Sequence, residues 1–195
     1  MGRERQIKKN EATRKAILDT AVAIGLEEGF GALSIRKITD KLGYSSGIVY
    51  HYFKDKQEIL NTIHTQTSIS LKDAVVSCIS PERSFAENTR LVFNMLSEAF
   101  AYEPHMFKLI LLNKFSNGNE SVIMWVDMIK QCIELGVKSG ELRDIDTEIT
   151  AYVLLNSFLV SQMVITERKT VDENTIKHIF DTELDIILNG ILNKE

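Results

Sequence analysis

The order of apolar and polar residues predicts a chain made almost entirely of α-helices. Apolar side chains recur at helical spacing through most of the sequence, and the period-two alternation of a β-strand is nearly absent. Only two prolines interrupt the pattern. We therefore predict an all-α fold of about nine helices. Their expected ranges are about 11–28, 34–42, 45–53, 55–79, 80–102, 104–115, 120–139, 146–168 and 172–192.

Capping residues set the predicted ends of these helices. Gly43 follows the second helix, where a residue with a left-handed backbone is common. Asp55 and Glu58 form a capping box at the start of the fourth helix. Ser80 followed by Pro81 is predicted to begin the fifth helix, because proline is favoured at the first helical position.

Three helices have distinctive apolar patterns. In the third helix, Val49 and Phe53 are four positions apart and are expected to face the core. Helix 146–168 is apolar on most of its circumference, and helix 172–192 carries a long apolar stripe. Such helices are buried either in a core or against another subunit.

Charge is distributed unevenly along the 195 residues. The formal net charge is −4, yet residues 1–64 carry +3 and residues 65–195 carry −7. A basic first third on an acidic body is expected where only the first third meets a polyanion. The overall composition, 44% hydrophobic and 26% charged, is that of a globular protein with a full core.

Several functional classes leave no signature in the sequence. Cys78 and Cys132 are isolated, so we expect reduced thiols, no zinc site and no cofactor. The N-terminus lacks the apolar segment of a secretory signal, and the longest apolar run, 153–165, is too short to span a bilayer. We expect a cytoplasmic protein without membrane contact. No catalytic motif or phosphate-binding loop is visible, so we do not expect an enzyme.

The first helices together predict a helix-turn-helix, whose last two helices are joined by a tight glycine turn. A recognition helix reads base edges through residues near its N-terminus. Gly47 would allow a close approach to DNA, and hydroxyl, phenol and imidazole groups can bond to phosphates or bases. The residues predicted to contact double-stranded DNA are Ser34, Arg36, Ser45, Ser46, Gly47, Ile48, Tyr50, His51 and Lys56.

Residues 14–60, RKAILDTAVAIGLEEGFGALSIRKITDKLGYSSGIVYHYFKDKQEIL, resemble the DNA-binding domain of the tetracycline-repressor-like (TetR) family of bacterial regulators. The resemblance implies a homodimer that binds a palindromic operator, usually to repress. It also implies that Ser34, Ser45, Gly47, Tyr50, His51 and Lys56 lie at or near DNA. The positions that carry the resemblance are Ile17, Leu18, Ala21, Gly29, Phe30, Ser34, Ile38, Gly43, Ser45, Gly47, Tyr50, Phe53, Lys56 and Leu60.

The sequence departs from the family pattern at four positions of this unit. Ser46 stands where a basic residue is frequent and Ile48 where threonine is frequent. Tyr44 replaces a small aliphatic residue and Thr39 an alanine. We expect Ser46 and Ile48 to set the operator preference, Ile48 through contact with a thymine methyl group. For Tyr44 and Tyr52, packing at the edge of the unit and contact with DNA are equally compatible with the sequence.

The basic N-terminus and the histidines allow less specific predictions. Arg3, Arg5, Lys8 and Lys9 precede the first predicted helix and form either an arm that reaches DNA or a frayed, solvated tail. His64 and His178 are expected to face solvent or a helix end.

The predicted domains are a helix-turn-helix domain over residues 1–54 and a larger helical regulatory and dimerisation domain over residues 55–195. Helices 146–168 and 172–192 are expected to pair with those of a second subunit, because two half-sites require two copies. Large flexible and aromatic side chains in the middle helices suit a cavity for a small apolar or amphipathic effector. The candidate lining residues are Phe93, Met95, Phe107, Trp125, Met128, Asn156 and Gln162.

Two functions follow from these predictions. In the first, the chain is a ligand-responsive transcriptional regulator, most often a repressor, in which an effector shifts helix 55–79 and alters the spacing of the two recognition helices. Ligand and DNA binding would then be reciprocally coupled. In the second, the chain is a helical protein that binds a small molecule or a partner and carries a vestigial DNA-binding unit.

Overall fold

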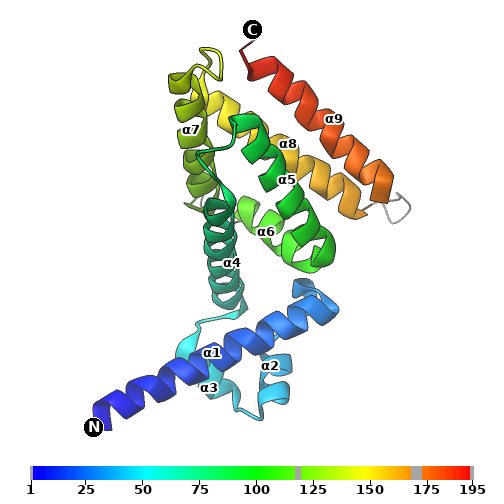
Figure 1. Ribbon diagram of the computed structural model, residues 1–195. Helices are drawn as coiled ribbons and strands as arrows, with labels where there is room; N and C mark the ends of the chain where they lie inside the picture. The colour runs from blue at the N-terminus through cyan, green and yellow to red at the C-terminus, as the bar shows by residue number, and fades with distance from the viewer. Residues whose placement is uncertain (1, 117–119, 168–172, 194–195) are drawn as a thin grey trace. The chain divides into compact units, whose positions relative to one another are not determined.

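The computed structural model describes residues 2–116, 120–167 and 173–193, which form nine α-helices and one short 3-10 helix (Figure 1). The prediction of an all-α fold is confirmed. The elements are α1 (Gly2–Glu28), η1 (Phe30–Ala32), α2 (Ile35–Leu42), α3 (Ser46–Tyr52), α4 (Lys56–Cys78), α5 (Phe85–Tyr102), α6 (Pro104–Ser116), α7 (Glu120–Ser139), α8 (Thr147–Glu167) and α9 (Glu173–Ile191).

The chain divides into two compact units. Unit 1 contains Met1–Ile69 and His105–Asn117, and unit 2 contains Ser70–Pro104 and Gly118–Glu195. Helix α4 therefore contributes its first part to unit 1 and its last turns to unit 2. This division differs from the predicted boundary after residue 54, because α4 and α6 supply buried side chains to the core of unit 1. The functional domains over residues 1–54 and 55–195 remain a prediction.

One hydrophobic core holds unit 1 together. It joins the inner faces of α1, α2 and α3 to the first turns of α4 and to Leu109 of α6. The burial of Val49 and Phe53, at 0% and 1% exposure, confirms that this face of α3 points inward. The buried members are Ile17, Leu18, Ala21, Ile24, Phe30, Leu33, Ile38, Val49, Phe53, Ile59, Ile63 and Leu109.

Helix α1 begins at Gly2, so the predicted start near residue 11 is wrong. The residues before position 11 include arginine, lysine, glutamate and glutamine, which have high helix propensity. They continue the helix, and Gln6 donates a side-chain hydrogen bond to Asn10 one turn later (3.1 Å). The N-terminal basic residues are therefore part of a helix and do not form a frayed tail, and their contact with DNA stays a prediction.

Helix α5 begins at Phe85, so the predicted start at Ser80–Pro81 is also wrong. The N-cap is Ser84, whose Oγ accepts a hydrogen bond from the backbone N–H of Glu87 (3.2 Å). The Glu87 carboxylate accepts the backbone N–H of Ser84 in return (2.9 Å), which completes a capping box. The backbone N–H of Ser84, more than its hydroxyl, holds the pKa of Glu87 below its ordinary value.

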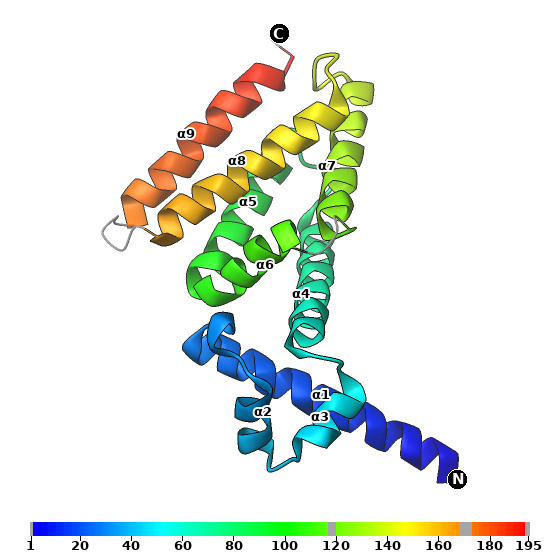
Figure 2. The same ribbon diagram turned by 180° about the vertical axis from the view of Figure 1, so that it is seen from behind.

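Unit 2 is built from α5, α7, α8 and α9, and Figures 1 and 2 show α8 and α9 lying side by side. The Phe93 and Phe158 rings pack edge to face with centroids 4.9 Å apart. Asp146, the first residue of the predicted helix 146–168, caps α8 and accepts the N–H of Ile149 (2.9 Å). Asp172, the first residue of the predicted helix 172–192, lies outside the described residues.

Candidate DNA-binding surface and effector cavity

Helix α2 is fixed at both ends by its capping residues. The Ser34 hydroxyl oxygen accepts the backbone N–H of Lys37 (3.2 Å), and Gly43 ends the helix in the left-handed region (φ 67°). Ile38 is fully buried beneath the helix, whereas Arg36 is exposed. Arg36 therefore lies on the surface, as a residue that contacts DNA must.

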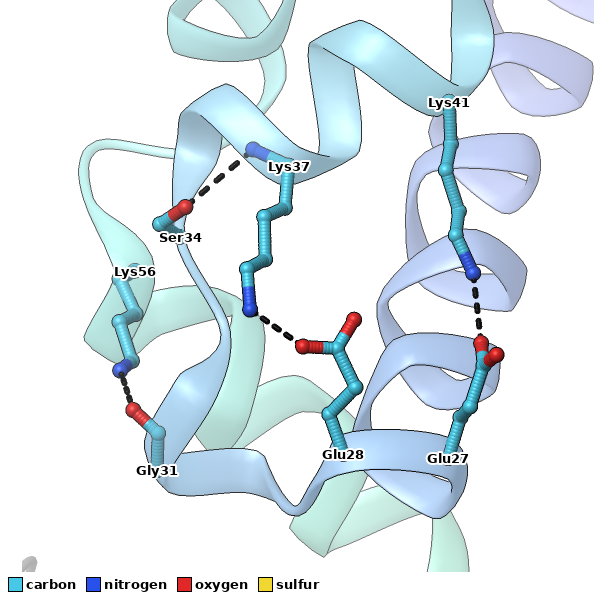
Figure 3. Close-up of polar contacts among 7 residues, drawn as sticks. All are labelled: Glu27, Glu28, Gly31, Ser34, Lys37, Lys41 and Lys56. Carbon is cyan, nitrogen blue, oxygen red and sulfur yellow. Dashed lines mark hydrogen bonds and ion pairs between the residues drawn. The ribbon is translucent and has the colours of Figure 1, made fainter.

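Two ion pairs connect α2 to the end of α1 (Figure 3). Lys37 pairs with Glu28, and Lys41 pairs with Glu27 at 2.8 Å. The hydrogen bond between Lys41 and Glu27 raises the pKa of the lysine and lowers the pKa of the carboxyl group. The four side chains are between 40% and 66% exposed, so these pairs link α2 to α1 but add little to stability.

Helix α3 separates a buried face from an exposed one. The Arg14 guanidinium of α1 lies 4.8 Å from the centre of the Phe53 ring. This cation–π contact helps to hold the buried face of α3 against α1. A Cβ added at Gly47 would meet only the Ser45 hydroxyl, at 3.8 Å, so a partner can approach the backbone closely. The exposed residues of α3 and its N-cap are Ser45, Ser46, Gly47, Ile48, Tyr50 and His51.

Lys56 has a structural partner that the sequence did not indicate. Its Nζ donates a hydrogen bond to the carbonyl oxygen of Gly31 in η1 (3.0 Å, Figure 3). The contact fixes the start of α4 against the segment that leads into α2. An ammonium group has three donors, so Lys56 keeps two for another acceptor.

The unusual residues of this unit are mostly accounted for by packing. Thr39 is buried, and its hydroxyl donates to the carbonyl oxygen of Arg36 (2.8 Å), so the extra polar group is satisfied. Tyr52 is half-buried and its hydroxyl donates to Asn10 Oδ1 of α1 (3.2 Å). Tyr44 is half-buried. No sequence pattern indicated the contact between Tyr52 and Asn10, which are 42 positions apart.

His64 is buried in unit 1, so its predicted exposure is wrong, whereas His178 is exposed as expected. The residue lies on α4, and its side chain forms a hydrogen bond with the backbone of Ile110 in α6. Burial lowers the pKa of His64, and the hydrogen bond only partly offsets that effect. One helical turn further on, Ser68 Oγ is buried and has no hydrogen-bond partner among the described residues.

Unit 2 contains a cavity of about 510 Å³. Its walls come from the last turns of α4 and from α5, α7 and α8, and most of its lining is apolar. Of the predicted lining residues, Phe93, Trp125 and Met128 are present. The volume and the apolar lining suit a small apolar molecule.

The other predicted cavity residues lie elsewhere among the described residues. Phe107 is buried in unit 1, and Asn156 is on the exposed side of α8. Gln162 is buried, but its amide donates to the Ser97 hydroxyl (2.7 Å), and Met95 is half-buried outside the cavity wall. Helical spacing could not separate Phe107 and Gln162 from the true lining, because these two residues also occupy core positions.

Sequence reasoning missed the polar groups at one end of the cavity. Glu141 Oε1 accepts the backbone N–H of Phe85 at the start of α5 (2.6 Å). Arg83 donates to the Cys78 carbonyl oxygen (2.8 Å), and Asn88 donates to that of Ser80 (2.8 Å). The protein itself thus provides partners for the polar lining. Cys132 also lines the cavity, and burial raises the pKa of its thiol.

Helices α8 and α9 carry exposed apolar side chains at helical spacing. Those of α8 recur at intervals of three, four and seven residues along one side. These residues, which we name the α8–α9 face, are Ile149, Tyr152, Val153, Val160, Met163, Ile179 and Ile186, between 42% and 69% exposed.

Among the helices in residues 2–116, 120–167 and 173–193, none is long and apolar enough to cross a membrane. Within the same residues, no group of three or more His, Cys, Asp or Glu side chains is arranged to hold a metal ion.

Comparison with known proteins identifies the helix-turn-helix unit. Residues 17–63 match the model of the family described as "Bacterial regulatory proteins, tetR family". An uncharacterised HTH-type transcriptional regulator of Bacillus subtilis, YhgD, is 24% identical over 75% of this chain and 80% of its own length. The HTH-type transcriptional repressor KstR2 of Rhodococcus jostii is 24% identical over 91% of this chain and 90% of its own.

Solved structures of TetR-family regulators have the same fold. A crystal structure of a TetR-family transcriptional regulator from Pectobacterium atrosepticum superposes with a TM-score of 0.78 and 20% identity, over 96% of this chain and 97% of that one. The family match coincides with the segment that forms the helix-turn-helix and the first turns of α4. The helix-turn-helix unit belongs to the tetR family of bacterial regulatory proteins, and the protein is a DNA-binding transcriptional regulator.

Proposed function

We propose that the protein is a ligand-responsive repressor that binds a palindromic operator as a homodimer in the cytoplasm. The observation that carries the proposal is the exposed face of α3, which stands on the buried anchors Val49 and Phe53. In a tetR-family chain, this face has the side chains and the close backbone approach that major-groove recognition requires.

The exposed side chains of α3 have distinct proposed roles. Ser46 and Gly47 lie in its first turn, where a recognition helix meets base edges. Ile48 is 39% exposed and offers an apolar contact to a thymine methyl group. Tyr50 and His51 offer hydrogen-bonding groups to bases or phosphates. Ser34, Arg36, Ser45 and Lys56 complete the proposed contact set.

Dimerisation is proposed through the α8–α9 face. A monomer would leave seven large apolar side chains exposed on two neighbouring helices. Pairing with a second copy would bury them in a four-helix interface and supply the second recognition helix. The predicted segments 146–168 and 172–192 contain all of these residues.

The proposed effector is a small, mainly apolar molecule that occupies the cavity of unit 2. Arg83 and Glu141 carry opposite charges at the same end of the lining, and both already have hydrogen-bond partners in the protein. The two charges cancel, so the lining has no net charge to attract a strongly ionic ligand, and apolar burial would supply most of the affinity.

Helix α4 is the proposed route from effector to DNA. Val75 and Ile79 lie at the end of α4 and just after it and line the cavity, while Ile59 and Ile63 of the same helix belong to the core of unit 1. A ligand that moves the end of α4 would thus disturb the unit that holds α3. The two binding events would be coupled reciprocally.

The DNA-binding part is tested with the Tyr50→Ala variant. A duplex is first selected by the wild-type protein from a random pool, and affinities are then measured by gel shift. Loss of a base or phosphate contact should weaken binding by about 1–3 kcal/mol. Tyr102→Ala is the matched control, because Tyr102 is 85% exposed in unit 2. Failure to select any duplex would favour the alternative of a ligand- or partner-binding protein with a vestigial DNA unit.

The effector part is tested with Trp125, the only tryptophan of the chain and a residue of the cavity wall. Addition of a medium-chain alcohol such as decanol should change its fluorescence and release the selected duplex. The Val92→Phe variant, which fills part of the cavity, should lose both responses. Ligand binding without any change in DNA affinity would contradict the coupling.

A further inference from the structure

The first turns of α1 carry basic side chains that neither the core nor the face of α3 uses. We name residues 4–10 the basic extension. Arg5, Lys8 and Lys9 are all exposed, and their spacing of three and four residues places them on one side of the helix. The extension precedes the segment that matches the family, which begins at residue 17.

The other basic residues of α1 and α2 whose side chains are described all have partners, unlike these three cations. Lys15 pairs with Asp19, Arg36 with Asp40, Lys37 with Glu28 and Lys41 with Glu27, and Arg14 lies over the Phe53 ring. Within the described residues, no ion pair involves the three cations of the extension. Their charge is thus available to an anionic partner.

The basic extension is also attached to the recognition helix. Asn10 Oδ1 accepts hydrogen bonds from the Tyr52 hydroxyl (3.2 Å) and from the Gln6 amide (3.1 Å). Tyr52 is the last residue of α3, so the attachment is at the C-terminal end of that helix. Figures 1 and 2 both show α1 continuing past α3 toward the N-terminus. At 1.5 Å per residue, Arg5 lies about 8 Å beyond Asn10 along the axis.

We propose that the basic extension binds the DNA backbone beside the base pairs that α3 reads, and so lengthens the operator footprint. The proposal rests on the DNA-binding function proposed above. Charge complementarity favours a polyanion, and the continuity with α3 favours the same duplex. The single exposed apolar residue of the extension, Ile7, is too little for an apolar partner surface.

The test compares two lengths of one selected duplex. The long duplex extends beyond each outer half-site by one helical turn, about 10 base pairs. The trimmed duplex ends at the half-sites. The variant Arg5→Gln/Lys9→Gln removes two cations per subunit and is compared with Lys138→Gln/Arg143→Gln, which removes two exposed cations from unit 2.

The Arg5→Gln/Lys9→Gln variant should bind the long duplex more weakly than wild type and the trimmed duplex equally well. On the long duplex, the slope of log affinity against log salt should become shallower by up to about 3–4, because each lost phosphate contact removes about 0.9. The control variant should match wild type on both duplexes.

Tyr52→Phe tests the attachment without removing a charge or the aromatic ring. It should weaken binding to the long duplex only, with unchanged helix content by circular dichroism. Equal affinity of wild type and Arg5→Gln/Lys9→Gln for the long duplex would overturn the inference and leave the proposed function standing. Failure of the wild-type protein to bind either duplex would contradict the proposed function itself.

Discussion

At the residue scale, Gly29 separates α1 from η1 in a backbone conformation that other residues avoid. Its φ is 83° and its ψ is 143°, and an added Cβ would lie 3.4 Å from His105 Nδ1. Gly29→Ala should lower the free energy of unfolding by about 1–3 kcal/mol, because alanine would have to adopt a positive φ that is strained for a residue with a side chain. Urea unfolding measures the change.

The matched control for Gly29 is two residues away. A Cβ added at Gly31 would meet nothing within 4 Å, and its φ is not positive. Gly31→Ala should therefore unfold at nearly the wild-type urea concentration. A similar loss in both variants would show that the backbone conformation at Gly29 is not the cause.

His64 makes a prediction about pH. Burial lowers its pKa below the ordinary 6.5, so the folded protein binds this proton less tightly than the unfolded chain. The neutral side chain contributes fully above about pH 6.5, and stability should fall as the pH drops below that value toward the lowered pKa. Urea unfolding at a series of pH values between neutral and mildly acidic measures the effect.

Two variants isolate the titration of His64 from that of other groups. His64→Gln should remove this part of the acid sensitivity, while His178→Gln should keep it, because His178 is exposed. An unchanged pH dependence in His64→Gln would assign the sensitivity to other groups.

At the element scale, the start of α5 depends on Ser84 and not on Ser80. Ser84 accepts the N–H of Glu87, and this helix end also forms one end of the cavity wall. Ser84→Ala should destabilise the protein by about 0.5–2 kcal/mol, measured by thermal or urea unfolding. Ser80→Ala should cost less, because Ser80 Oγ accepts only the N–H of Glu82 in a turn (3.2 Å). Equal costs would contradict the assignment of the cap.

The recognition helix shows how elements are positioned by contacts outside themselves. With seven residues, α3 is too short to be stable alone. Val49 and Phe53 anchor it in the core, Tyr52 attaches it to α1, and Lys56 fixes the chain that follows it. The exposed side chains of α3 are therefore not needed to hold the helix in place and can contact DNA.

At the scale of the whole molecule, the α8–α9 face predicts the oligomeric state. Val160→Lys should raise the dimer Kd more than about 10-fold, because the interface would bury an unpaired charge. Val160 is 56% exposed on this face. Sedimentation velocity over a range of concentrations measures the effect.

The control for the dimer is Ile123→Lys on α7. Ile123 is similarly exposed, at 48%, but lies outside the α8–α9 face. This variant should sediment as wild type and keep its affinity for the selected duplex, whereas Val160→Lys should lose affinity along with the dimer. A Val160→Lys protein that remains dimeric would place the interface elsewhere.

The sequence by itself determined the features that depend on local order. The period of the apolar residues established the helices, and the inward face of α3 followed from Val49 and Phe53. The surface predicted to contact DNA followed as the opposite face of α3. The predictions of the helices and of the inward face of α3 succeeded because the pattern of a helix is contained within a few turns of the chain, whereas the DNA contacts themselves stay a prediction.

Only the tertiary structure decided which distant residues meet. His64 is buried because α6 packs against α4, and Tyr52 and Lys56 have partners 42 and 25 positions away. Phe93 and Phe107 are both apolar residues at helical spacing, yet Phe93 lines the cavity of unit 2 and Phe107 lies in unit 1. Periodicity indicates that a side chain faces inward, but the packing of other helices determines what it contacts there.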